Sequence, residues 1–169
     1  MKKLIILLGV IFVILASAFI WLRYSNWQVS GSNKTELIRL EESIKGLQLI
    51  TDKDFKIRLI EYLDVEEKKD YKKVYNYISQ QYLNINYPNV KNAEEFQKAR
   101  GDKYMWEVGI KYTEVINFVV INTTNYQVDL KFQYYAEDVE GQGKMRMFFV
   151  KEDNLWKYVD EKILEKQIL

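Results

Sequence analysis

After residue 33, apolar side chains first recur at spacings of three and four residues, which is the period of an α-helix. One stripe of this kind is formed by Leu37, Leu40, Ile44 and Leu47. A second pattern covers Asp54–Glu67, and its apolar positions are Phe55, Ile57, Ile60 and Leu63. The sequence therefore predicts one amphipathic helix over about 34–50 and another over 54–67.

Two further helices are predicted between residues 70 and 100. Asp70 is of a residue type that caps helix N-termini, and the segment after it places five apolar or aromatic side chains on one face: Tyr71, Val74, Tyr75, Ile78 and Tyr82. Pro88 ends this region, because proline does not continue a helix. Asn92 can cap a short helix that turns Ala93 and Phe96 inward.

After Gly101 the pattern changes to alternation, the period of a β-strand. Tyr126–Tyr134 alternates between apolar and polar side chains throughout. The other predicted strands are Tyr104–Gly109, Lys111–Ile121, Lys144–Lys151 and Leu155–Asp160, joined by turns at Asn122–Asn125, Gly141–Gly143 and Glu152–Asn154. Helices followed by an antiparallel meander predict an α+β domain in which helices pack on one face of a curved sheet.

The first 24 residues form an apolar segment. Leu4–Leu22 carries no charge, and as a helix it would span roughly 28 Å, close to the hydrocarbon thickness of a bilayer. Lys2 and Lys3 precede it, which places the leading end in the cytoplasm. We expect a transmembrane anchor over 1–24, a linker over 25–33 and an extracytoplasmic domain over 34–169. The alternative is a signal segment cleaved after Ala18, which would leave a secreted domain.

The composition excludes several classes of chemistry. The chain has no cysteine and no histidine, so it has no disulfide, no thiolate nucleophile and no imidazole base or metal ligand. No acidic cluster has metal-ligand spacing and no glycine loop could hold a phosphate, so we expect no metal and no cofactor. Beyond Lys2, Lys3 and Arg23 the chain is mildly acidic and evenly mixed, which gives no electrostatic reason to expect nucleic acid.

The order of these elements resembles the nuclear transport factor 2-like (cystatin-like) α+β cone superfamily over about residues 54–164. Bacterial envelope members often carry an Asp-Tyr-x-x-x-Tyr helix, as Asp70, Tyr71 and Tyr75 provide here. They also often close with a turn into a Trp-Lys strand, as at Trp156 and Lys157. The resemblance implies a cone-like fold that serves ketosteroid-isomerase-like enzymes, pocket-binding proteins and catalytically silent envelope domains, such as those of type IV secretion and conjugation machines. Fold alone does not settle function.

An isomerase of this kind needs a carboxylate base on an apolar wall and a donor for the developing oxyanion. By strand parity, Glu114 shares a face with Tyr112, Ile116, Phe118 and Val120. Tyr112 or Tyr134 could supply the donor. The sequence favours the simpler alternative, in which Glu114 lies at an exposed strand end or pairs with a lysine. Asp129 is expected to be a solvated residue of the polar face.

The strands Lys111–Ile121 and Lys144–Lys151 carry apolar residues on both predicted faces. A sheet covered on one side alone should alternate throughout. We therefore expect the second face to be covered by the helix over 34–50, by an envelope protein, or by a second copy in a homodimer through the sheet.

The sequence thus predicts a bacterial single-pass membrane protein with one extracytoplasmic domain, located in the cell membrane. Its expected role is non-catalytic protein binding or assembly in the cell envelope. The alternative is a ligand-binding or ketosteroid-isomerase-like domain that uses the cone cavity through Glu114 and Tyr112. An inhibitor or immunity protein is a further possibility that the sequence does not separate from the first.

Overall fold

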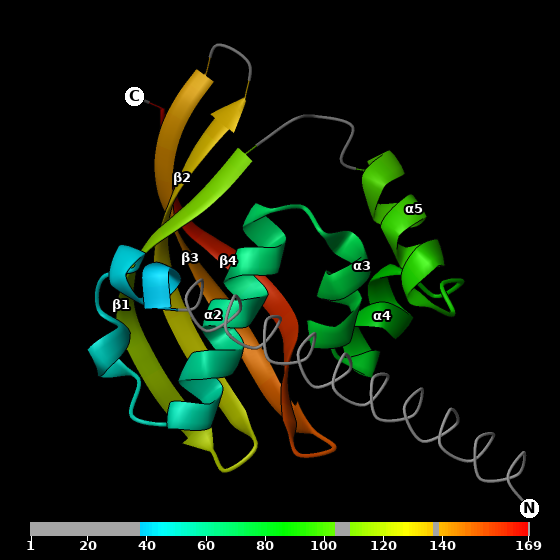
Figure 1. Cartoon of the computed structure of the whole chain (residues 1–169), viewed down its shortest axis with the longest axis horizontal. Coiled ribbons are helices and arrows are strands. Elements are labelled where there is room, and N and C mark those ends of the chain that lie inside the picture. The colour runs from blue at the N-terminus through cyan, green and yellow to red at the C-terminus, as the bar shows by residue number, and fades with distance from the viewer. Residues whose placement is uncertain (1–37, 104–108, 137–138, 169) are drawn as a thin grey trace, which may run out of the picture. The chain divides into compact units, whose positions relative to one another are not determined.

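The computed structural model describes residues 38–103, 109–136 and 139–168. The chain divides into two units, 1–39 and 40–169. The second unit contains the helices η1 (Leu47–Leu49), α2 (Lys53–Glu67), α3 (Tyr71–Val74), η2 (Tyr75–Tyr77), α4 (Gln80–Asn86) and α5 (Ala93–Lys103). Its strands are β1 (Gly109–Asn122), β2 (Asn125–Ala136), β3 (Val139–Glu152) and β4 (Leu155–Ile168) (Figure 1).

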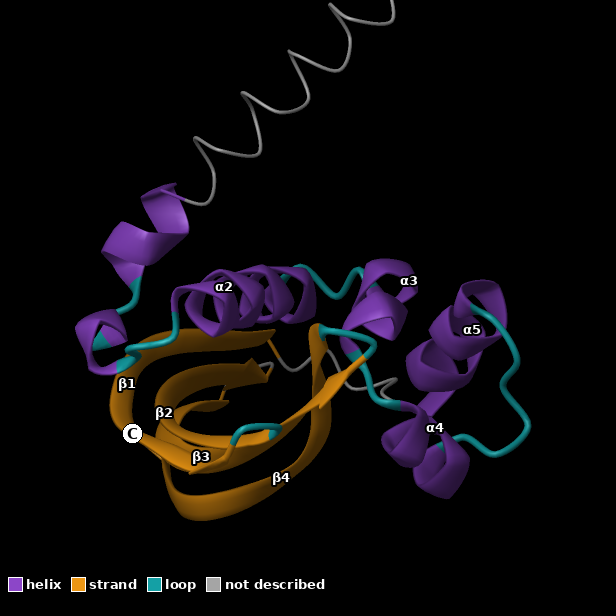
Figure 2. Ribbon diagram, turned by 90° about the horizontal axis from the view of Figure 1, so that it is seen from below, coloured by secondary structure: helices purple, strands orange, loops and turns teal. Residues whose placement is uncertain are grey.

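The four strands form one antiparallel sheet in the order β1-β2-β3-β4. Figure 2 shows that this sheet is strongly curved, that α2 lies along one of its faces, and that α3, α4 and α5 gather beyond its side. The prediction of an α+β domain with helices on a curved antiparallel sheet is therefore confirmed.

Two of the three predicted turns are confirmed and one is wrong. The turn before β4 contains Asp153 and Asn154 at φ 49° and 63°, the left-handed backbone that tight hairpins need. Gly141 and Gly143, in contrast, lie within β3 opposite Tyr134 and Phe132. A Cβ on either glycine would come within 2.7 Å of the opposing aromatic ring. These glycines therefore make room for rings, and the connection falls between Ala136 and Val139.

The inner face of the sheet, defined as the face against α2, carries an aromatic core around Phe55. This side chain is fully buried. Its ring centroid lies 5.0–5.6 Å from four others, those of Phe118, Tyr126, Phe149 and Trp156. Phe118 stacks on Phe55 and the other three rings stand edge-on to it. Because rings in these arrangements attract one another as well as burying area, this cluster fixes α2 on the sheet.

The helix over 54–67 is found as α2, with Asp52 accepting a hydrogen bond from the Phe55 amide at 2.9 Å as its N-cap. Ile57 was predicted on the apolar stripe, but it is 40% exposed, and Leu59 is fully buried instead. The apolar set Phe55, Ile60 and Leu63 fixes a helical face that leaves Ile57 at its margin, whereas Leu59 lies at its centre.

The single helix predicted from Asp70 is interrupted at Ile78. Asp70 does cap α3, accepting from the Lys73 amide at 3.2 Å. Ile78 is extended and bridges to Tyr158, and the amide of buried Ser79 donates to the Tyr158 carbonyl at 2.8 Å. The Ser79 hydroxyl then caps α4 by accepting from the Tyr82 amide. Pairing with β4 and a new cap thus replace helix continuation at this point.

The stripe predicted over 34–50 is correct in burial and wrong in structure. Leu40, Ile44 and Leu47 are all buried, but the helix ends at Ser43. The backbone of Lys45 pairs with the edge of β1, donating to Thr113 and accepting from Val115 at 3.0 and 2.8 Å. Gly46 follows at φ 77°.

Gly46 is predicted to be intolerant of a side chain. Its backbone is left-handed, and an added Cβ would lie 2.0 Å from the Val115 carbonyl oxygen, a backbone atom that is held in the sheet. Gly46→Ala should therefore lower the free energy of unfolding by more than the roughly 1–2 kcal/mol of left-handed strain alone. Urea denaturation measures this, with Gly101→Ala as the control, since nothing lies near a Cβ there. Equal stability of the two variants would contradict the placement of Gly46.

The predicted anchor over 1–24 and the linker over 25–33 lie outside the described residues, as does most of the predicted strand Tyr104–Gly109, of which Gly109 begins β1. Within the described ranges, none of the helices has the length and apolarity that a membrane crossing requires.

Candidate functional site

The inner stripe of α2 ends in a charged residue. Phe55, Leu59 and Tyr62 are buried at helical spacing, and Glu66 is the next position on the same face. The Glu66 side chain is only 9% exposed. On α5, Arg100 follows the fully buried Phe96 by four residues, and its side chain is 14% exposed. Two helix faces thus bring opposite charges together inside the domain.

Glu66 and Arg100 form an ion pair in which both carboxylate oxygens are engaged. Nη2 of Arg100 lies 3.0 Å from both carboxylate oxygens of Glu66. The Tyr62 hydroxyl donates to Oε1 of Glu66 at 3.1 Å. Burial raises the pKa of Glu66, although Arg100 opposes this. Burial disfavours the charged form of Arg100, but Glu66, Tyr62, Tyr82 and Tyr87 together raise its pKa.

Three more side chains surround this pair. Tyr158 on β4 stacks on Tyr62 with centroids 5.2 Å apart, and Tyr112 on β1 is buried beside them. Burial raises the pKa of both tyrosines, and Glu66 adds to the effect on each. Glu161 on β4 reaches solvent in part, yet its surroundings raise the pKa of its carboxyl by desolvation. We call Tyr62, Glu66, Arg100, Tyr112, Tyr158 and Glu161 the inner polar cluster.

The two residues proposed for isomerase chemistry lie on opposite faces of β1. Tyr112 pairs with Phe132, but Thr113 forms a β-bulge, so Glu114 pairs with Lys131 on the outer face. The Glu114 carboxylate lies 2.5 Å from Lys131 Nζ and is 35% exposed. The hydrogen bond from Lys131 lowers the pKa of Glu114. The parity that placed Glu114 beside Tyr112 is therefore wrong, because one extra residue reverses every later side chain.

The other candidate donor, Tyr134, lies on the inner face of β2. Its hydroxyl donates to the Gln167 carbonyl at 3.4 Å, and Lys166 lies over its ring at 4.5 Å. Its hydroxyl is thus engaged with β4. Tyr112 alone of the predicted site residues belongs to the inner polar cluster, and its backbone amide donates to Oε1 of Glu67 at 2.7 Å.

Asp129 was expected to be solvated but is only 5% exposed. Arg146 donates to both of its oxygens, at 2.7 and 2.9 Å, and these bonds lower the pKa of Asp129. A bidentate guanidinium–carboxylate pair is among the stronger polar contacts. It stabilises the outer face across β2 and β3, where Gln127 also contacts Asp129 at 3.4 Å.

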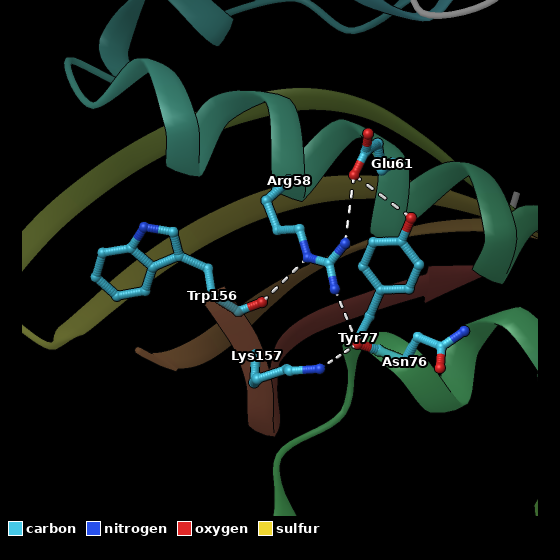
Figure 3. A network of polar contacts seen from close by, with 6 residues as sticks. All are labelled: Arg58, Glu61, Asn76, Tyr77, Trp156 and Lys157. Carbon is cyan, nitrogen blue, oxygen red and sulfur yellow. Dashed lines mark hydrogen bonds and ion pairs between the residues drawn. The ribbon is translucent and has the colours of Figure 1, made fainter. Parts of the chain in front are cut away.

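A second polar network joins α2, η2 and β4 (Figure 3). Arg58 donates to the carbonyls of Asn76 and Trp156 at 2.8 and 3.3 Å, and its guanidinium lies 3.8 Å from the centroid of the Tyr77 ring. Lys157 also donates to the Asn76 carbonyl. Two cations lie at the carboxyl end of η2, where they hydrogen-bond a carbonyl that the helix leaves unpaired and interact favourably with the helix dipole. The contacts of this network thus hold α2, η2 and β4 together.

The sequence pattern does not single out Glu66, Arg100 or Glu161, each for a physical reason. Glu66 belongs to a mixed charge run that suggests a solvated junction, yet it continues the spacing of Phe55, Leu59 and Tyr62. A charge on an apolar helical stripe was the available signal, and Arg100, four residues after Phe96, offered the same one. Glu161 follows a bulge at Val159 in β4, which no sequence feature marks.

The described ranges contain no group of three or more acidic side chains that could hold a metal ion. A half-open hollow is formed by residues of all four strands. It is lined mainly by polar side chains, which include Lys131, Gln133, Gln142, Lys144 and Gln167. Neither Glu66 nor Glu114 lines it.

No protein-family model matches the sequence, and no curated protein matches it. Among solved structures, a scytalone dehydratase-like protein from Novosphingobium aromaticivorans is 12% identical with a TM-score of 0.48, over 73% of this chain and 89% of that one. An NTF-2-like protein of unknown function from Shewanella oneidensis is 15% identical with a TM-score of 0.46, over 63% of this chain and 97% of that one.

Bd1075 from Bdellovibrio bacteriovorus is also 15% identical with a TM-score of 0.46, over 63% of this chain. The match spans 37% of Bd1075, well under two thirds of its length. The names of the neighbours thus include an NTF-2-like protein of unknown function, a scytalone dehydratase and an epoxide hydrolase.

Proposed function

We propose that this chain is a membrane-anchored extracytoplasmic domain that binds or assembles with other proteins of the cell envelope and catalyses no reaction. The observation that supports this most strongly is that the Glu66 carboxylate is hydrogen-bonded within the chain. Both of its carboxylate oxygens already accept hydrogen bonds, from Arg100 and Tyr62, at 3.0–3.1 Å.

A general base needs a lone pair directed at the proton that it removes. Arg100 also opposes the rise in the pKa of Glu66 that burial causes. Glu114, the carboxylate first considered, is on the outer face and pairs with Lys131. Both carboxylates are thus committed to partners within the chain, as structural charges are.

The apolar segment Leu4–Leu22 supports the membrane location. An anchor confines the domain to the neighbourhood of the bilayer, which raises its effective concentration around membrane partners. Binding at this surface would then need only modest intrinsic affinity.

A second candidate is binding of a small ligand at the inner polar cluster. Glu161 favours it, because this carboxyl lies on the inner face beside Tyr158, has a pKa raised by desolvation, and still reaches solvent. In this alternative Glu161 and Tyr112, rather than Glu114, would contact the ligand.

The proposed function is tested by crosslinking the tagged full-length chain in cells, followed by membrane fractionation and mass spectrometry. We expect the chain at full mass in the membrane fraction, with a protein partner recovered in stoichiometric amount. Ala18→Leu is the matched control, because a large residue at this position blocks signal cleavage and should change nothing in an anchored protein. A native chain shortened at Ala18, recovered without any protein partner, would contradict the proposal.

A further inference from the structure

The last strand presents an open edge. β4 is an edge strand of the sheet, as Figure 2 shows, and every residue from 160 to 168 is exposed. In the part of the chain that the structure describes, the free edge of β4 is bridged at Tyr158, by Ile78. Ile163 and Leu164 are 48% and 40% exposed at the middle of the open stretch. Exposed edges with apolar centres are sites at which further strands pair.

The charged residues along this edge have a pattern in which an acid and a base exchange places when the stretch is read backwards, so two antiparallel copies are complementary. The stretch Glu161–Lys166 reads Glu-Lys-Ile-Leu-Glu-Lys. Set antiparallel to a second copy about a two-fold axis between residues 163 and 164, it places Glu161 opposite Lys166 and Lys162 opposite Glu165. Each charged position then faces the opposite charge, and the apolar centre faces itself.

The β-bulge of β4 makes this register possible. Residues directly opposite in an antiparallel pair point to the same face, but positions five apart in a regular strand point to opposite faces. Leu164 is an extra residue between the pairs Met145–Ile163 and Lys144–Glu165. As a result Glu161 and Lys166 lie on the inner face, opposite Met147 and Gly143 of β3.

The same bulge places Lys162 and Glu165 together on the outer face, opposite Arg146 and Lys144. Lys162 lies opposite Arg146, whose charge is already balanced by Asp129. Lys162 makes no ion pair within the described ranges. Glu165 pairs with Lys144 of its own chain at 2.6 Å, and in this register its carboxylate also lies beside Lys162 of the second copy, which gives Lys162 an ion-pair partner.

We propose that two copies of this chain associate through antiparallel pairing of their β4 edges, centred between Ile163 and Leu164, so that the two sheets join into one. A two-fold, self-complementary contact is the commonest form of homo-oligomer. The paired stretch is short, and confinement of both copies to one membrane would favour it through their effective concentration. This association does not depend on which envelope protein the domain binds.

Single-cysteine variants of the full-length protein in mild detergent test the register, because the chain has no cysteine of its own. In the proposed register the two Cα atoms of residue 163 lie about 6 Å apart, within disulfide range. Those of residue 168 lie about 30 Å apart. Ile163→Cys should therefore form a disulfide-linked dimer on mild oxidation. Ile168→Cys, on the same strand and face, should not.

Lys162→Glu tests the charges in the protein without added cysteine. The change places like charges opposite each other at both ends of the pair, so the dissociation constant of the dimer should rise about tenfold. The substitution should leave the monomer folded, because it places a carboxylate opposite Arg146 in its own chain. Analytical ultracentrifugation measures the constant, and circular dichroism checks the fold.

Three results would overturn the proposal: a native chain that is monomeric throughout the micromolar range, crosslinking of Ile168→Cys as efficient as that of Ile163→Cys, or unchanged dimerisation of Lys162→Glu. All use purified protein, so they are independent of whether an envelope partner is found in cells.

Discussion

Replacing Arg100 with methionine is expected to destabilise the protein by about 3–5 kcal/mol at neutral pH, because it leaves a buried carboxylate without its cation. Glu66 is 9% exposed, and its charge is balanced mainly by Arg100 at 3.0 Å. Methionine approximates the length of the arginine stem, so the loss of packing should be small compared with the loss of charge compensation.

The penalty should depend on pH in a defined direction. Burial already raises the pKa of Glu66, and removal of Arg100 raises it further. A carboxyl with a higher pKa in the folded than in the unfolded chain favours folding only while it is protonated. The stability of the Arg100→Met variant should therefore be close to that of the unsubstituted protein near pH 4, around the pKa of glutamate in the unfolded chain. It should fall as the pH rises toward the pKa of Glu66 in the folded variant.

Urea denaturation of the full-length protein at pH 4.5 and pH 7.5 measures this difference. The matched variant is Glu66→Gln with Arg100→Met, which removes both charges and keeps an acceptor for the Tyr62 hydroxyl. It should regain most of the stability lost at pH 7.5, since neutral replacement of a buried pair is often well tolerated. If the Arg100→Met variant had the same stability at both pH values, the Glu66–Arg100 pair would be contradicted.

Phe55→Ala is the second substitution with a large expected effect, a loss of about 3–5 kcal/mol. Phe55 is fully buried, and its ring contacts four others within 5.6 Å. Its removal would open a cavity at the point where α2 meets the sheet, and rings held by the sheet cannot collapse fully into that space.

Ile57→Ala on the same helix is the control for Phe55→Ala. Ile57 is 40% exposed, and alanine is the better helix former, so the expected loss is below about 1 kcal/mol. Near-UV circular dichroism during urea denaturation follows both variants. If Ile57→Ala were as destabilising as Phe55→Ala, the side of α2 that faces the sheet would be wrongly assigned.

The sequence predicted correctly those helices and strands in which the apolar residues keep the period of the element from one end to the other. Tyr126–Tyr134 alternates without interruption, and the structure shows β2 with Tyr126 and Tyr134 buried. The helix α2 was found for the same reason. Ser79 shows the limit, because its amide pairs with the Tyr158 carbonyl, far away in sequence, and such a contact leaves no local signal. The apolar stripe therefore suggested a continuous helix.

The candidate site was less predictable, because it depends on β-bulges. Thr113 and Ile116 each add one residue to β1 relative to β2, and each reverses the faces of the residues after it. Simple parity placed Glu114 on the face of Tyr112 as a candidate general base. The alternative that the sequence favoured, pairing with a lysine, is the one that the structure shows, with Lys131. Glu66 was hidden in a charged run, although its helical position pointed inward. The many charged residues around Glu66 suggested that it is exposed to solvent, whereas its place in the helical period indicated the core.

The central claim is that the Glu66–Arg100 pair serves the fold, while the function of the chain lies in binding other proteins. The most direct test is the in-cell crosslinking of the full-length Glu66→Gln, Arg100→Met double variant beside the native chain. The predicted result is the same membrane partner, recovered at the same yield. Loss of that partner from a double variant that folds with native stability would contradict the claim and assign the function to the inner polar cluster.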